Sequence, residues 1–302
     1  SGNSDLQPDM VWLKQRSGSE NHNLYDSVRG AGKRLIPNLQ NSESTTNELT
    51  AFNTDGFSLA DGDEVNKSSS TYVAWCWKAN GSGSANTAGS INTTSTSVNT
   101  TAGFSISTYT GNNTSGATIG HGLGVTPNLI WVKQRNADSS YWIVYHHKVS
   151  SAPETDYLAL NSTDAVADAD VFWNDTAPSS TLITLGNDGW VNGSSTTHVC
   201  YAFAEKQGYS KFGSYKGNGN ADGPYIHLGF KPAFVIFKDT AARSWYLMDN
   251  KRDPENVVNN RLFPDAGDGD STGLNVLDFL SNGIKIKTND VSVNASGNTY
   301  TF

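Results

Sequence analysis

The chain repeats one pattern three times, and this repetition constrains the fold more than any other feature of its 302 residues. In each copy a proline is followed by a short apolar segment that runs into a lysine. These segments occupy residues 10–16, 129–135 and 234–238. Self-similarity over a long period indicates a protein built from copies of one supersecondary unit. The chain is therefore predicted to consist of tandem modules, each with its own packed core.

Two more landmarks recur in the same order. Asp-Gly or Asn-Gly before an apolar residue, typical of a hairpin turn, stands at 55–57, 188–190 and 282–284. A closing segment follows at 71–77, 197–203 and 299–302. In the first two closing segments aromatic and small residues alternate, which favours a central strand in a sheet covered on both faces. The predicted fold is all-β, made of tandem antiparallel β-sandwich modules of jelly-roll or lectin-like type.

The landmarks also set the expected domain limits. Residues 1–79 form a first module without the lead-in segment of the other two, 104–207 form the second, and 208–302 the third. Residues 80–103 are almost wholly Asn, Gly, Ser, Thr and Ala, which predicts a flexible linker or a long loop. The third copy stops inside its closing segment, so the polypeptide is expected to continue beyond Phe302.

Charge and composition argue against several classes of partner. The formal net charge is -8 and no cluster of basic residues stands out, so no nucleic-acid partner is expected. No apolar run is long enough to cross a bilayer, so membrane insertion is not expected either. Cys76 and Cys200 lie at equivalent closing segments of different modules, which predicts two free, buried thiols rather than a disulfide.

An acidic, glycine-rich stretch offers one candidate metal site. Asp265, Asp268 and Asp270 are spaced closely on a bending backbone, as calcium ligands often are. The stretch lacks the spacing and the terminal glutamate of an EF-hand, and a solvated acidic loop is the competing interpretation. Calcium is the one cofactor that the sequence suggests.

Three tryptophans are candidates for carbohydrate binding, because sugar rings stack on exposed aromatic side chains. They are Trp142, Trp173 and Trp245. Trp173 lies among polar turn residues and is the best candidate for exposure. Packing in a core is the competing interpretation for all three.

Nothing in the chain predicts catalysis. It has no Gly-x-Ser-x-Gly elbow, no phosphate loop and no HExxH motif. His146 and His147 are adjacent on an expected strand and so point to opposite faces. Asp26 and Asp249 occupy corresponding places in their copies, but the second copy has His146 there, and a catalytic carboxylate would not be replaced so freely. The chain is expected not to be an enzyme.

With the repeat defined, residues 104–135, 201–205 and 208–215 resemble the tandem module common in virion structural and tail-fibre-like proteins of marine tailed phages. The resemblance implies a concanavalin-like or lectin-like sandwich with no chemical activity. It implies an extracellular virion protein that associates with other virion proteins and with itself, and that adsorbs to a host surface glycan. Two alternatives stay open: a carbohydrate-binding module of a secreted polysaccharide-active enzyme, and a calcium-dependent surface adhesin.

Overall fold

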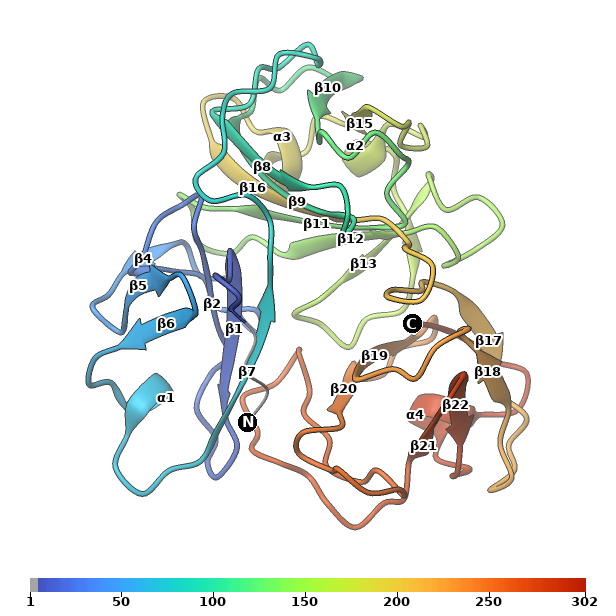
Figure 1. The fold of residues 1–302 in the computed structure, drawn as a ribbon. Helices are drawn as coiled ribbons and strands as arrows, with labels where there is room; N and C mark the ends of the chain where they lie inside the picture. Colours follow the sequence, from blue (N-terminus) through green and yellow to red (C-terminus); the bar gives the residue numbers. More distant parts are fainter. Residues whose placement is uncertain (1–4) are drawn as a thin grey trace.

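The computed structural model describes residues 5–302 and is all-β, with antiparallel sheets and four single-turn helices. The three sequence copies form three lobes around a common centre, the first at the left of Figure 1, the second at the top and the third at the lower right. In the described part of the chain, no helix has the length and apolar character needed to cross a membrane. The predicted all-β class is confirmed.

The elements follow the three copies along the chain. The first module contains β1 (Met10–Gln15), β2 (Asn23–Asp26), β3 (Lys33–Arg34), β4 (Ser44–Thr45), β5 (Leu49–Asn53), β6 (Gly56–Leu59), α1 (Asp63–Asn66) and β7 (Tyr72–Trp77). The second contains β8 (Ser95–Asn99), β9 (Phe104–Thr110), β10 (Ala117–Gly120), β11 (Leu129–Gln134), β12 (Trp142–His146), β13 (Asp156–Ala159), β14 (Ala167–Asp168), α2 (Asp170–Trp173), β15 (Leu182–Leu185), α3 (Gly189–Asn192) and β16 (Thr197–Phe203). The third contains β17 (Ser214–Lys216), β18 (Tyr225–His227), β19 (Phe234–Asp239), β20 (Tyr246–Asp249), β21 (Leu277–Leu280), β22 (Gly283–Ile286), α4 (Val291–Asn294) and β23 (Thr299–Thr301).

The three lysine-bearing strands occupy the same place in their sheets. β1, β11 and β19 each pair on one side with the next strand of the chain, which is β2, β12 or β20. On the other side each pairs with the closing strand of its copy, β7, β16 or β23. The registers agree as well, because Lys14, Lys133 and Lys238 lie opposite Val73, Val199 and Thr301. The predicted repeat of the lysine strands is confirmed.

The closing strands differ in their surroundings. β16 lies between β11 and β9, as predicted for a central strand, whereas β7 is the edge of the sheet β2-β1-β7. The prediction of a central β7 is wrong, because the described first module has no lead-in strand to cover that edge. Both cysteines are free; Cys200 is buried as expected, but Cys76, on the edge strand β7, is exposed.

Residues 80–103 are not the free linker that their composition suggested. β8 adds a strand to the seven-stranded sheet of the second module by pairing with β9, and Ile91 forms a bridge with Ile119. Small residues let this backbone lie close to its neighbours: a Cβ on Gly89 would lie 2.3 Å from the carbonyl oxygen of Thr118. The segment is therefore a structural part of the second lobe.

Each main sheet buries its two faces against different partners. One face packs in a core within its own module, around Val11 in the first, Ile143 in the second and Phe279 in the third. The opposite faces of all three sheets meet in one shared core, where the rings of Trp12 and Trp131 lie 5.8 Å apart, edge to face. The modules therefore depend on one another for burial and are not independent beads.

Equivalent hydrogen bonds close the three modules into a ring. At each junction a ring N–H from the start of the second strand of one module donates to a main-chain carbonyl of another. The bonds are Trp142 to Ile36, Trp245 to Ala159 and His22 to Phe263, at 3.1, 2.9 and 3.1 Å. The His22 ring must donate from Nε2, because its Nδ1 accepts from Trp12 Nε1 at 2.9 Å.

The repeated lysines are fully buried. Each ammonium group donates to main-chain carbonyls at the end of its strand or in the turn that follows. These acceptors include Gln15 for Lys14, Ser140 for Lys133 and Asp239 for Lys238. Burial lowers the pKa of Lys14 to about 8, of Lys133 to about 7 and of Lys238 to about 8. The lysines thus serve as turn-capping groups inside the protein.

Substitution of Lys133 by methionine is expected to lower the free energy of unfolding by about 2–3 kcal/mol, because it leaves the buried carbonyl oxygen of Ser140 and the partly buried one of Gln40 without their donor. Chemical denaturation measures this loss. The matched control is Lys148→Met at an exposed position, which should change stability by less than about 0.5 kcal/mol. Equal stability of the two variants would contradict the capping role.

Candidate functional site

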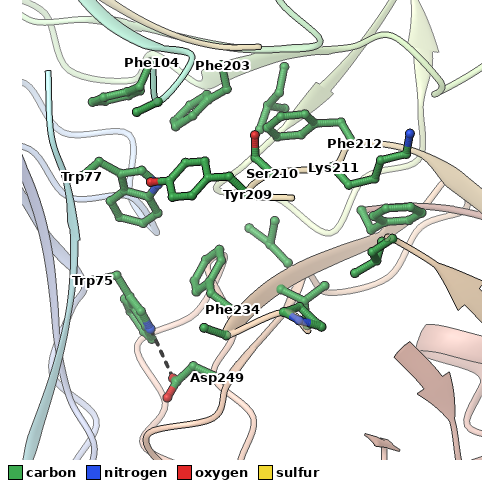
Figure 2. A pocket seen from close by; sticks show the side chains of 18 of the residues that line it. Trp75, Trp77, Phe104, Phe203, Tyr209, Ser210, Lys211, Phe212, Phe234 and Asp249 are labelled. Atoms are coloured by element: carbon green, nitrogen blue, oxygen red, sulfur yellow. Dashed lines mark hydrogen bonds between the residues drawn. The ribbon is translucent and has the colours of Figure 1, made fainter. Parts of the chain in front are cut away.

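A cavity of about 440 Å³ lies where the three modules meet, and we call it the central cavity. Its walls come from β7 of the first module, from the ends of β9 and β16 of the second, and from residues 209–212 and β19 of the third. Figure 2 shows the aromatic side chains that line it. The aromatic residues of the lining are Trp75, Trp77, Phe104, Trp131, Phe203, Tyr209, Phe212, Phe230, Phe234 and Phe302.

The aromatic side chains are packed against one another in pairs. The rings of Phe104 and Phe203 lie 4.8 Å apart, and Phe234 makes edge contacts with Trp77 at 5.7 Å and with Trp75 at 5.9 Å. Tyr209, in contrast, is 60% exposed, and in Figure 2 its side chain is directed toward Trp77. The cavity therefore offers a firm apolar lining with one exposed aromatic residue at its edge.

One carboxylate, Asp249, lies among the described residues that line the cavity, and it is already engaged. Its Oδ2 accepts from Trp75 Nε1 at 3.1 Å and from Arg252 Nε at 2.7 Å. Burial by itself would raise the pKa of Asp249, but the Arg252 guanidinium holds it below its usual value. Asp249 is thus a charged partner of arginine at neutral pH and is not poised as a proton donor.

The same arrangement recurs at another junction. Asp26 accepts from Arg29 Nε at 2.5 Å and from the Tyr201 hydroxyl at 2.6 Å, so a closing strand again donates to the aspartate of a different module. In the second module His146 stands at this position, and its Nε2 lies 3.1 Å from the carbonyl oxygen of Phe302. These corresponding residues therefore join modules.

The structure does not bring Asp265, Asp268 and Asp270 together as one set of ligands. Asp270 is held by two arginines, Arg16 at 2.7 Å and Arg252 at 2.7 Å, and Asp265 accepts from the main-chain N–H of Trp245 at 2.9 Å. Asp268 is exposed. Within residues 5–302 no group of three or more His, Cys, Asp or Glu side chains is placed to hold a metal ion.

This stretch instead fastens the third module to the first. Asp270 N donates to Arg16 O at 2.8 Å, and Gly269 lies so close to the first module that a Cβ there would come 2.6 Å from the same oxygen. Glu43 plays the equivalent part between the first and second modules, bridging Arg29 and Arg135. Of the three proposed ligands, Asp270 is thus used in a junction, because arginines of two modules face it.

Excess chelator is therefore expected to leave the melting temperature unchanged, because the carboxylate of Asp270 is neutralised by arginine and not by calcium. Calorimetry with and without a calcium chelator measures this. A drop in melting temperature of several degrees on chelation, reversed by added calcium, would contradict the assignment.

The three tryptophans proposed for sugar stacking are all buried. Trp142 and Trp245 lie in the shared core, where their ring N–H groups form the junction bonds described above. Trp173 lies in the core of the second module at 1% exposure, so core packing, the competing interpretation, is confirmed for the tryptophan that seemed the best candidate for exposure. Its polar neighbours form a tight turn whose backbone has positive φ at Asn174 and Asp175, and this turn folds the indole inward. None of the three offers a free ring face.

Sequence reasoning did not identify the central cavity, although several of its residues belong to the repeated landmarks. The sequence places three aromatic residues in the closing strands: Trp75, Trp77 and Phe203. It does not show which side chains they pack against, or that they line one cavity. Tyr209 and Phe212 lie in the short connection between the second and third modules. Their aromatic character in an otherwise polar connection is the signal that could have marked them.

The architecture defines an all-β protein of three structurally repeated units closed around a shared core. The chain belongs to the family described as Domain of unknown function (DUF7483), whose profile matches residues 2–302. A search of curated proteins and a search of solved structures each found no match.

Proposed function

We propose that this chain is a non-enzymatic structural protein of a tailed-phage virion, part of a tail fibre, an appendage or a capsid decoration. It acts through assembly with other virion proteins and with itself, in an extracellular particle, and through adsorption to a host surface that carries glycans. The resemblance of residues 104–135, 201–205 and 208–215 to tail-fibre-like modules supports the phage assignment.

The observation that carries the structural role is the closed ring of three modules around one core. One junction is built on a fully enclosed ion pair of the first module, Asp26 with Arg29, to which the Tyr201 hydroxyl of the second module donates. Such pairs add little net stability over apolar packing, but they fix one arrangement of the parts where they serve a registry role. A rigid unit of this kind suits a particle that survives outside a cell.

The lining of the central cavity favours the same class over an enzyme. General acid–base catalysis needs a titratable group free to exchange a proton with a substrate. Asp249 is bound by Arg252 and Trp75, and Lys251 and Lys211 are exposed. The alternatives of a carbohydrate-binding module and a calcium-dependent adhesin receive less support, because the three candidate tryptophans are buried and Asp270 is paired with two arginines.

The proposal is tested by asking whether the protein is part of the phage particle. Gradient-purified phage particles that encode this chain should contain its peptides by mass spectrometry, and antibodies raised against the folded chain should label an external feature of the particle in electron micrographs. Peptides confined to the soluble lysate, with unlabelled particles, would overturn the proposal.

A further inference from the structure

The third module leaves open an edge that is covered in the second. In the second module β8 pairs with the outer side of β9, and Ile91 N donates to Thr118 O in β10 at 2.9 Å. β17 and β18 take the places of β9 and β10 in the third module, because β17 pairs with the closing strand and β18 with β22. Each is the last strand of its sheet, at the right of Figure 1. Residues 204–213, which lead into β17, contain no strand that could cover this edge.

The free side of β17 presents unpaired main-chain groups. Gly213 and Phe302 exchange hydrogen bonds of 3.1 and 2.9 Å on the side of β23, and alternate residues of an antiparallel pair face opposite sides. The N–H and C=O groups of Phe212 and Ser214 therefore face the free side. There the carbonyl oxygen of Phe212 lies 3.1 Å from His147 Nε2, whereas the N–H of Ser214 has no acceptor within residues 5–302.

A cavity of about 420 Å³ lies at this open edge, and we call it the edge pocket. Its lining includes residues 211–215 of the β17 segment and all of β18. From the second module it includes His147 and Lys148, which follow β12. The pocket is thus formed where the third module has no counterpart of β8.

Two positions of the edge pocket carry larger side chains than their counterparts in the second module. By register, Tyr225 stands where the second module has Thr118. His227 stands where it has Gly120, which has no room for a Cβ because residue 86 lies against it. Tyr225 is 45% exposed, and its hydroxyl group donates to a main-chain carbonyl oxygen at 3.2 Å. The tyrosine is therefore fixed at its hydroxyl end and still presents its ring to solvent.

The charged side chains of the pocket are mainly basic, in a chain whose formal net charge is -8. Lys148 and Lys211 supply ammonium groups, and Glu205 supplies the one carboxylate side chain of the lining. Glu205 pairs with Lys211, whereas exposed Lys148 forms no ion pair within the described part of the chain. The uncompensated charge of Lys148 favours an anionic ligand.

We propose that the edge pocket binds an acidic saccharide, with a sugar ring against Tyr225 and a carboxylate near Lys148 and the N–H of Ser214. The inference rests on the proposed adsorption to a host glycan and names the class of glycan. Tyrosine combines an apolar ring face with a polar end, as a sugar ring requires. Ammonium and main-chain N–H groups form charge-assisted hydrogen bonds with carboxylates.

A polypeptide strand is a less suitable occupant of the same edge. β17 pairs with β23 over three residues only, and Lys216 stands at its end. Short edge strands that carry lysine resist the addition of a further strand. The open main-chain groups are therefore assigned to a saccharide.

The probes for the experiment are hexagalacturonate, a hyaluronan tetrasaccharide and sialyllactose, titrated into the full chain by calorimetry. At least one is expected to bind with a Kd below about 1 mM. Its methyl ester keeps the sugar rings but loses the charge, and should bind at least about tenfold more weakly. No binding of any probe at about 10 mM, or equal binding of the ester, would overturn the proposal. Binding of pentaglutamate as tight as that of the best saccharide would also overturn it, in favour of a polypeptide.

Variants place the bound saccharide in the edge pocket. Lys148→Met and Tyr225→Thr should each weaken binding at least about tenfold while leaving the melting temperature within about 2 °C, because both side chains are exposed. The matched controls are Lys231→Met and Tyr209→Thr, at exposed positions outside this pocket, which should leave the Kd unchanged. Unchanged binding in both pocket variants would contradict the assignment.

These results can be told apart from those that test the virion assignment. If peptides of the chain are present in particles but the purified chain binds no acidic saccharide, only the edge pocket proposal fails. If the purified chain binds through Lys148 and Tyr225 but is absent from particles, only the virion assignment fails.

Discussion

Replacement of Asp26 by alanine is expected to lower the free energy of unfolding by about 3–5 kcal/mol. The Asp26 carboxylate is fully buried and accepts hydrogen bonds from Arg29 Nε, Arg29 N and the Tyr201 hydroxyl. Burial on its own would lower the pKa of Arg29, but Asp26 raises it, so the guanidinium stays charged. Without Asp26 that charge is buried with only Glu43 near it. Urea denaturation followed by tryptophan fluorescence measures the loss.

Two further variants separate the parts of this effect. Tyr201→Phe removes only the hydrogen bond between modules and should cost about 1–2 kcal/mol. Asp63→Ala removes an exposed partner of Lys67 and should change stability by less than about 1 kcal/mol. If Asp26→Ala were no less stable than Asp63→Ala, the junction would not depend on the buried pair.

The repeat could be predicted from sequence because its signals are local. A proline, an alternation of apolar residues and a turn pair act over a few positions, and the same faces are buried wherever they recur. The equal registers of Lys14, Lys133 and Lys238 follow from this. The closing of the ring could not be predicted in this way. It depends on contacts between residues far apart in the sequence, such as Arg16 and Asp270, which are 254 residues apart.

Composition misled the interpretation of residues 80–103 for a physical reason. Serine and threonine favour a solvated segment, but their hydroxyl groups can also form hydrogen bonds with one another inside a sheet. The Thr96 hydroxyl lies 2.8 Å from that of Thr93 and 3.0 Å from that of Ser107, and all three are buried. A polar strand with this internal bonding looks the same in sequence as a linker.

The candidate site could not be predicted from the sequence, because it depends on contacts between modules that local patterns do not show. The central cavity takes walls from all three modules, so no single copy of the repeat contains it. The periodicity of Val235 and Phe237 in β19 places these side chains in the core of the third module, but it does not report whether a strand lies beside them. Only the pairing of β19 with β23 shows this.

Acidification from pH 7 to pH 5 is expected to lower the free energy of unfolding by an amount on the order of 5 kcal/mol through three buried histidines. Burial lowers the pKa of His22 to about 3, of His146 to about 3 and of His198 to about 4. The unfolded chain takes up these protons near the ordinary histidine pKa of about 6.5, whereas the folded protein does not. Stability is therefore complete above about pH 6.5 and is lost as the pH falls toward 4.

The geometry explains why protonation is resisted at His22. Its Nδ1 accepts from Trp12 Nε1 and its Nε2 donates to Phe263 O, so a second ring proton would face the Trp12 N–H. His22→Gln should therefore reduce the slope of unfolding free energy against pH by about 1.4 kcal/mol per pH unit between pH 5 and 6. Carboxylates titrate alike in both proteins, so their share cancels in the comparison. His227→Gln, at an exposed position, should leave the slope unchanged, and equal slopes in the His22 variant and the parent would show that His22 takes up its proton in the folded state.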